Sequence, residues 1–337
     1  MIIRSKAPFR VSFGGGGTDM PPYCTEHGGC VISTTIDRHA YITIEPREDK
    51  KIHVFSENYN KEKIFNIGDK NYSENFELFK GIVNVLNVKD GFNITTYSEM
   101  PAGSGMGGSS SLSVALIGAF NKYYNFGLNR HEIALKACDI ERIELKQKGG
   151  YQDQFAAAYG GFNYIEFSDR VKVTPIDTTH EIINELQYRL ILCYVGGSHF
   201  SSAIQDEVLK GYEIEKKSFM EAMQDLKLVA HSMKSIVESK KIDKLNEFGD
   251  LLHKGWLAKK SLSSKITNKD IENFYLISRD SGVIGGKLLG AGGGGHLLLF
   301  SHPDERFNVI QELKKIGGKI VNFHFNPRGL EVWEVND

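Results

Sequence analysis

The residues best suited to chemistry lie in and around three clusters of glycine. The clusters span residues 14–17, 103–108 and 292–295. The middle cluster belongs to the run 101–111, which reads PAGSGMGGSSS and leads directly into a helical pattern. Glycine lets the backbone approach a ligand closely, and a helix N-terminus presents free N–H groups and the positive end of its dipole to an anion. The middle cluster therefore predicts a phosphate-binding loop, most often one for a nucleotide.

The same loop also satisfies a second pattern. Gly103, Gly105 and Gly108 match G-x-G-x-x-G, which is typical of dinucleotide-binding folds when an acidic residue follows about 20 residues later. Residues 128–131 read LNRH instead, so a dinucleotide-dependent oxidoreductase is the less favoured alternative. The loop also lacks the lysine of the strict P-loop. Backbone N–H groups are then expected to hold phosphate, while the serines at 109–111 either cap the helix or lend a hydroxyl to Mg²⁺.

Two carboxylates fall on the apolar face of the helix predicted over residues 131–146. They are Glu141 and Glu144. A carboxylate in that position is costly unless it is bound to a metal or paired with a cation. Arg142 and Lys146 should project from the side opposite Glu141, so we expect them in solvent.

Two aspartates remain ambiguous when only their neighbours are considered. Asp153 directly precedes a short apolar helix, so it is either a helix cap or a functional carboxylate. Asp19 follows the first glycine cluster and precedes two prolines, so it is either a turn residue or a ligand of a polar substrate.

The elements that must position these residues alternate between strand and helix patterns. The first half has strand patterns at 31–36, 40–45, 51–55 and 93–97 and helical patterns at 109–124 and 131–146. The second half has a buried strand at 189–195, a charge-rich helical stretch to about 261, a helix at 270–278, and then strand 296–300, helix 304–316 and strands 319–323 and 330–335. These patterns predict an α+β protein of two domains, residues 1–180 and 181–337.

Composition excludes several classes of function. With 337 residues, 41% hydrophobic, 25% charged and a net charge of −1, the chain lacks the charge of a general nucleic-acid or membrane-surface binder. It has no apolar run of membrane-spanning length and no signal-peptide pattern, so a cytoplasmic location is expected. Its four cysteines lack paired spacing, which predicts buried thiols rather than a zinc site; they are Cys24, Cys30, Cys138 and Cys193.

Three motifs together resemble those of the GHMP kinases, the superfamily of galactokinase, homoserine kinase, mevalonate kinase and phosphomevalonate kinase. The first is APFR at 7–10 continuing through FGGGGTD at 13–19, the second is PAGSGMGGSS at 101–110, and the third is KLLGAGGGGH at 287–296. The resemblance implies an ATP- and Mg²⁺-dependent kinase. It also implies an N-terminal domain like domain 2 of ribosomal protein S5, a ferredoxin-like C-terminal domain, and an active site between them.

The resemblance also implies roles for individual residues. Asp153 would be the general base, and Arg10 would lie beside it and stabilise charge on the transferring phosphate. Ser109 and Glu141 would hold Mg²⁺. The nucleotide phosphates would contact Pro101, Gly103, Ser104, Gly105, Met106, Gly107, Gly108, Ser109 and Ser110, and the substrate would contact Gly16, Gly17, Thr18, Asp19, Gly293 and Gly294.

Within the superfamily, the first motif, FGGGGTDMPPY, and the tract 149–163 are similar to those of bacterial kinases for D-glycero-α-D-manno-heptose 7-phosphate. This implies phosphorylation of the anomeric C1 hydroxyl to the 1,7-bisphosphate, a precursor of GDP-heptose for surface polysaccharide. A fucokinase- or galactokinase-like sugar 1-kinase has a similar first motif and remains an alternative. The expected partner is a small sugar phosphate, with no nucleic acid or membrane; a homodimer is compatible with the sequence, which does not set the oligomeric state.

A sugar phosphate also requires a site for its own anion. The candidates are Arg38, His39, Arg142, Lys146, Lys148 and the segment 198–202, and the sequence does not choose among them.

Overall fold

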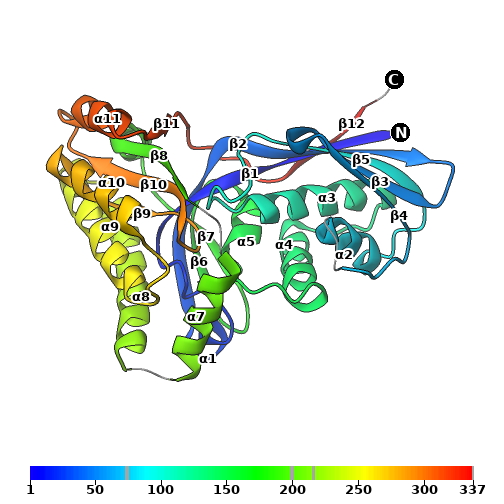
Figure 1. Ribbon diagram of the computed structural model, residues 1–337, viewed down its shortest axis with the longest axis horizontal. Helices are drawn as coiled ribbons and strands as arrows, with labels where there is room; N and C mark the ends of the chain where they lie inside the picture. Colours follow the sequence, from blue (N-terminus) through cyan, green and yellow to red (C-terminus); the bar gives the residue numbers. More distant parts are fainter. Residues whose placement is uncertain (73–75, 198–200, 215–216, 336–337) are drawn as a thin grey trace.

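Two β-sheets divide the computed structural model into two lobes, with residues 1–72, 76–197, 201–214 and 217–335 described (Figure 1). The first sheet has the order β12-β1-β2-β5-β3-β4, and β6 and β7 extend it from β2. Only β3 and β5 run parallel among its pairs. Its strands are β1 (Ile2–Gly14), β2 (Gly29–Arg47), β3 (Lys51–Ser56), β4 (Lys61–Asn66), β5 (Gly91–Ser98), β6 (Phe162–Phe167), β7 (Lys172–Pro175) and β12 (Glu331–Val335).

Helices of the first lobe lie on one side of this sheet (Figure 1). They are α2 (Glu77–Val85), α3 (Gly108–Tyr124), α4 (Arg130–Asp139) and α5 (Gln152–Tyr159). Helix α3 packs on β1 and β2, and the Ser5 hydroxyl on β1 donates to the Ala115 carbonyl at 2.7 Å. This packing places the N-terminus of α3, and the glycine loop before it, against the middle of β1.

The second sheet is antiparallel, with the order β11-β8-β10-β9. Its strands are β8 (Leu190–Gly197), β9 (Val283–Leu288), β10 (Gly294–Ser301) and β11 (Lys319–Val321). The helices of this part of the chain are α6 (His180–Arg189), α7 (Ser201–Glu213), α8 (Lys217–Glu238), α9 (Leu245–Lys260), α10 (Lys269–Asp280) and α11 (Arg306–Lys315). A short helix of the first half, α1 (Tyr23–His27), lies near α7 (Figure 1).

The two lobes share an apolar core, so their relative position is held by packing. Phe13 at the end of β1 lies 5.4 Å from Phe248 of α9, and Phe248 lies 5.8 Å from Phe300 of β10, measured between ring centroids. Offset and edge-on aromatic pairs at such distances are favourable beyond the area they bury. The end of β1, which carries Arg10 and leads into the first glycine cluster, is therefore fixed against the second lobe.

The α+β class and the two lobes predicted from the sequence are confirmed. The predicted strands 31–36 and 40–45 are one continuous strand, β2, which pairs with β1 on both sides of a register shift between Thr35 and His39. The last strand, β12, pairs with β1, so the chain end returns to the first sheet rather than staying with the second lobe. Apart from this return of β12, the predicted division of the chain near residue 180 stays a prediction.

All four cysteines are free and buried, as predicted. Across the described ranges, each helix is too short or too polar to cross a bilayer.

Candidate active site

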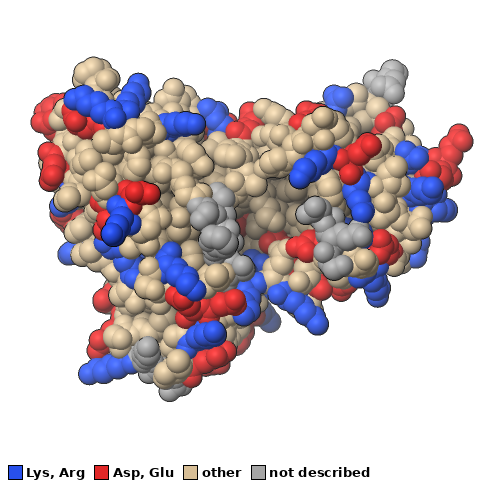
Figure 2. Space-filling model, in the orientation of Figure 1, with Lys and Arg blue, Asp and Glu red and all other residues tan. Residues whose placement is uncertain are grey.

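A cleft of about 1130 Å³ opens between the two lobes, and Figure 2 shows this hollowed face. The middle and third glycine loops form one side of it. Other parts of its lining come from β3, β5, the start of α2 and the chain after residue 141. Its lining includes Arg10, Tyr59, Phe76, Phe79, Glu141, Arg142, Lys146, Lys148, Asp153 and Gly294, together with residues 100–105, 107–110 and 289–292.

The middle glycine loop ends at the N-terminus of α3, as predicted. Gly103, Gly105 and Gly107 have φ angles of 73°, 78° and 79°, in the left-handed region that favours glycine. A Cβ on Gly105 would lie 2.6 Å from the Leu289 carbonyl oxygen, so this glycine is also required by the close approach of the third loop. Of the residues assigned to the phosphates, Met106 is buried and lies outside the cleft lining, while the others line it.

Arg10 joins Asp153 to the middle loop. Its Nε and Nη2 lie 2.7 and 2.6 Å from Asp153 Oδ1, and its Nη1 donates to the Gly105 carbonyl at 2.7 Å. Arg10 is buried, whereas Asp153 is partly exposed to the cleft. Helix α5 is capped at Tyr151 and Asp153 makes no capping bond, so the alternative of a helix cap is wrong.

Gly107 brings the loop backbone against Asp153. A Cβ there would lie 3.1 Å from the Asp153 carboxyl carbon. We expect Gly107→Ala to cost about 1–2 kcal/mol of stability, because its left-handed backbone disfavours a side chain, and to lower kcat at least about tenfold by displacing Asp153. Gly127→Ala is the matched control, since Gly127 has φ 74° but nothing within 4 Å of its Cβ position. Thermal unfolding and kcat check the pair; equal kcat in both variants would contradict the role given to Gly107.

Glu141 is buried at 3% exposure beneath the start of α3. Ser113 donates to Oε1 at 3.1 Å, Ser110 approaches Oε2 at 3.5 Å, and Arg142 Nη1 lies 3.5 Å from Oε2. Burial raises the pKa of Glu141, and the charge of Arg142 and the Ser113 hydrogen bond oppose that shift only in part.

The expectation that Arg142 faces solvent, away from Glu141, is wrong. Residues Ile140–Glu144 form a π-helical turn in which the Leu145 amide bonds to the Ile140 carbonyl at 2.9 Å. An i→i+5 turn inserts an extra residue per turn and rotates the side chains that follow, which brings Arg142 beside Glu141. Arg142 also donates to the Gly150 carbonyl at 2.7 Å, so it supports the loop that leads to Asp153.

The donor set around Glu141 fits Mg²⁺. A buried carboxylate beside serine hydroxyls offers hard oxygen ligands, and Mg²⁺ takes only one or two protein groups when phosphate and water complete its shell. The described residues contain no group of three His, Cys, Asp or Glu side chains that could hold a metal ion. Ser109 is exposed and lines the cleft one residue before Ser110, so either hydroxyl is available to the same ion.

The residues assigned to the substrate lie in two places. Gly294 lines the cleft, and Gly293 donates its amide to the Ile266 carbonyl at 2.9 Å. Asp19 is buried at 1% exposure: its Oδ1 accepts from the Gly17 amide at 2.9 Å, and its two oxygens accept from the Gln152 amide and side chain at 3.1 Å. Asp19 thus holds the backbone and side chain of Gln152, the residue before Asp153.

The other members of the first glycine cluster are also outside the cleft lining. The Thr18 hydroxyl is fully buried and bonds to the Gly15 and Cys30 backbones. Gly16 lies against Gln152. Contact of Gly16, Gly17, Thr18 or Asp19 with a substrate stays a prediction.

Three features of the site were not predicted from the sequence. Tyr59 accepts a hydrogen bond from the Ala102 amide at 3.0 Å, so it supports the start of the phosphate loop. His296 Nδ1 lies 2.8 Å from the Ser104 carbonyl, which ties the third motif to the second. Lys259, at the end of α9, is buried behind the third loop. Only His296 had a signal in the sequence, because it ends the third motif.

Of the cations suggested for a sugar phosphate, three line the cleft: Arg142, Lys146 and Lys148. Lys148 forms an ion pair with Asp206 of α7 across the cleft. Arg38 donates instead to the carbonyl of Asn322, directly after β11, and His39 bonds to Glu99. Residues 198–200 of the candidate segment lie outside the described residues.

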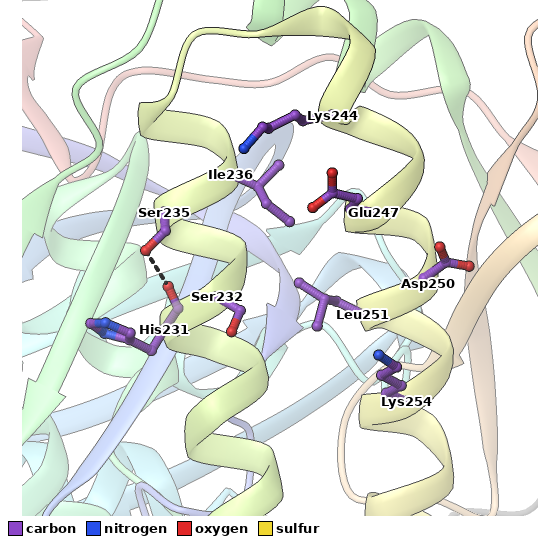
Figure 3. A pocket seen from close by; sticks show the side chains of 9 residues that line it. All are labelled: His231, Ser232, Ser235, Ile236, Lys244, Glu247, Asp250, Leu251 and Lys254. Carbon is purple, nitrogen blue, oxygen red and sulfur yellow. Dashed lines mark hydrogen bonds between the residues drawn. The ribbon is translucent and has the colours of Figure 1, made fainter.

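A second cavity, of about 470 Å³, lies between α8 and α9 (Figure 3). Glu247 and Asp250 lie along its rim between Lys244 and Lys254, and His231 and two serines of α8 lie opposite them. None of the residues discussed above lines it. We assign it no part in the chemistry.

The fold and the cleft together define a class of two-lobed small-molecule kinases, in which a glycine loop at a helix N-terminus holds phosphate beside an Arg–Asp pair. The chain belongs to the GHMP kinases: residues 77–161 match the family's N-terminal domain and residues 220–319 its C-terminal domain. Members of this family use ATP as the phosphate donor.

Within the family, the chain is similar to several sugar kinases. The chain is 36% identical to the D-glycero-alpha-D-manno-heptose 7-phosphate kinase of Campylobacter jejuni, over 99% of both chains. It is 24% identical to the L-fucokinase/L-fucose-1-P guanylyltransferase of Bacteroides fragilis, of which the match covers 36%. Among solved structures, a D-glycero-D-manno-heptose 1-phosphate kinase from Bacteroides thetaiotaomicron superposes with a TM-score of 0.81 at 29% identity, over 99% of this chain and all of the other.

Proposed function

We propose that the chain transfers the γ-phosphoryl group of ATP, with Mg²⁺, to the anomeric hydroxyl of D-glycero-α-D-manno-heptose 7-phosphate, and so forms the 1,7-bisphosphate. The observation that carries the proposal is the full-length 36% identity to the Campylobacter jejuni kinase of that name. The Arg10–Asp153 pair beside the glycine loop supports it, because this pair supplies the groups that the transfer requires.

The geometry supports a separate role for each residue of the site. Asp153 opens onto the cleft and would orient and deprotonate the acceptor hydroxyl, while Arg10 fixes one carboxylate oxygen and leaves Oδ2 for the substrate. Backbone N–H groups of residues 103–108 would hold the phosphates at the N-terminus of α3. Glu141 with Ser109 or Ser110 would hold Mg²⁺, which neutralises phosphate charge when bound.

The remaining assignments of this proposal concern the ends of the cleft. Tyr59 and the aromatic side chains of Phe76 and Phe79 line the end beside β3 and α2, which suits the base of the nucleotide. Arg142, Lys146 and Lys148 line the part of the cleft beside Glu141 and Asp153 and could receive phosphate.

A panel of acceptors tests the proposal. Purified protein with Mg·ATP is offered heptose 7-phosphate, heptose 1-phosphate, sedoheptulose 7-phosphate, mannose 6-phosphate, fucose, galactose and mevalonate, and ³¹P NMR locates each new phosphate. We expect turnover with heptose 7-phosphate and a new anomeric phosphate signal. Heptose 1-phosphate is included because the two heptose kinase relatives are named for different phosphates. Turnover with fucose or galactose alone would keep phosphoryl transfer and overturn the heptose assignment.

A further inference from the structure

Lys259 joins the second lobe to the catalytic centre through a continuous chain of contacts. It lies in the last turn of α9, is 8% exposed, and its ammonium donates a hydrogen bond to the Gly290 carbonyl. A Cβ on Gly290 would lie 2.6 Å from the Gly105 Cα, so the third and middle loops touch at these two glycines. Each of the two loops thus has a cation on its carbonyl at the contact: Lys259 on Gly290 and Arg10 on Gly105.

The contact continues to the acceptor side of the site. The Arg10 guanidinium that holds Gly105 also holds Asp153 Oδ1. A displacement of the third loop would therefore reach Asp153 through two glycine backbones and one arginine. Because active-site geometry tolerates errors of only a fraction of an ångström, the anchor of the third loop matters for turnover although it lies outside the cleft lining.

The charged groups around the contact are buried. Lys259 and Arg10 are 8% and 4% exposed, and the carboxylates that act on Lys259 are Asp19 and Asp153. Lys287 of β9 is also buried, at 4% exposure, but burial lowers its pKa well below the usual value, so it does not count as a cation. Arg10 and Lys259 therefore place two positive charges directly behind the loops that are expected to hold phosphate.

We propose that Lys259 is a positioning residue for phosphoryl transfer: its ammonium holds the two glycine loops in contact and adds a buried positive charge behind them that favours the transferring phosphate. The inference rests on the proposed kinase function but not on the identity of the sugar. It requires Lys259 to be charged during turnover.

The first test replaces the ammonium. We expect Lys259→Met to lower kcat about 10- to 100-fold, with KM for ATP and for the sugar changed less than about threefold, because the loops lose alignment rather than contact groups. Lys260→Met is the matched control: it is the next residue of α9, and its ammonium pairs with Glu272 outside the site. Lys259→Arg keeps the charge and should recover part of the lost kcat. A kcat of Lys259→Met within threefold of the wild type would overturn the inference.

The second test is a pH profile, which a merely structural role would not move. Burial lowers the pKa of Lys259 to about 8, the charge of Arg10 adds to this, and Asp19 and Asp153 oppose it. The ammonium is therefore present below about pH 8 and lost above it, so the wild-type kcat should fall on the alkaline side. An unchanged alkaline fall in Lys259→Met would also overturn the inference.

The two proposals fail in different ways. If the acceptor is another sugar, the panel shows wild-type turnover with that sugar instead of heptose 7-phosphate. The kcat of Lys259→Met is then compared with that of the wild type on that sugar, so the test of Lys259 still applies. If Lys259→Met does not fold, as judged by circular dichroism, the Lys259→Arg variant and the alkaline fall decide the question. A wild-type kcat that stays constant through pH 9 would contradict the role of Lys259 and leave the heptose assignment intact.

Discussion

Asp153→Asn lowers kcat by about 10²- to 10⁴-fold, with ATP affinity nearly unchanged, if Asp153 deprotonates the acceptor hydroxyl. The amide has the size of the carboxylate, and its oxygen can still accept from Arg10, so the loop geometry around Gly107 should persist. What is lost is the proton acceptor on the cleft side. Initial rates with saturating ATP and sugar measure kcat, and equilibrium titration with a non-hydrolysable ATP analogue measures nucleotide binding.

A matched control separates this effect from a general loss of charge. Asp169→Asn makes the same chemical change at an exposed turn between β6 and β7 and should leave kcat unchanged. Weakened nucleotide binding in Asp153→Asn would instead indicate that Asp153 mainly anchors the glycine loop through Arg10. A kcat within threefold of the wild type would remove Asp153 from the mechanism.

The parts of the fold that were predicted correctly are those with local signals. The helix after the glycine loop begins at Gly108 and ends at Tyr124, within one residue of the prediction, because its apolar stripe and flanking glycine and asparagine mark both ends. The elements expected from the sequence include neither β7 nor α6, which the structure places on the two sides of the predicted domain boundary. Helix α6 has few apolar residues, and its Ile182 and Leu186 are buried in the apolar core, so tertiary packing rather than local propensity stabilises it.

The pairing of β12 with β1 is likewise absent from any local pattern. More than 300 residues separate the two strands, and strand partners at such distances are chosen by the assembled sheet rather than by neighbouring residues. The consequence is functional, because β12 completes the edge beside the strand that carries Arg10.

In the site, too, the residues with a local signal were predicted and those placed by tertiary structure were not. The glycine loops, Arg10, Asp153 and Glu141 were identified because they belong to motifs or to an apolar helix face. The position of Arg142 was not, because a π-helical turn changes the rotation that a regular helix predicts. Lys259 carries no signal at all: a lysine near the end of a charged helix is usually solvated, and only the loop packed on its ammonium shows otherwise.

The proposed metal site leads to the second large effect, which combines activity with stability. Glu141→Gln keeps the size of the side chain and an oxygen for the Ser113 hydroxyl, but it removes the charge that would bind Mg²⁺. We expect kcat/KM for Mg·ATP to fall about 100-fold, and saturation to require more Mg²⁺. Glu144→Gln is the control, because Glu144 lies on the same π-helical turn as Glu141 but accepts a hydrogen bond from the Tyr72 hydroxyl.

The same variant should be more stable than the wild type in the absence of nucleotide. Burial raises the pKa of Glu141 above its value in the unfolded chain, so the native state carries a cost while the group is ionised. That cost is fully present above the folded pKa and disappears as the pH falls through it. We therefore expect Glu141→Gln to raise Tm by on the order of 2 °C at pH 8 and by less near pH 5. A lower Tm at pH 8 would mean that the pairing of Glu141 with Arg142 and Ser113 outweighs its desolvation, and Glu141 would then be a structural ion pair rather than a carboxylate kept in place for a metal.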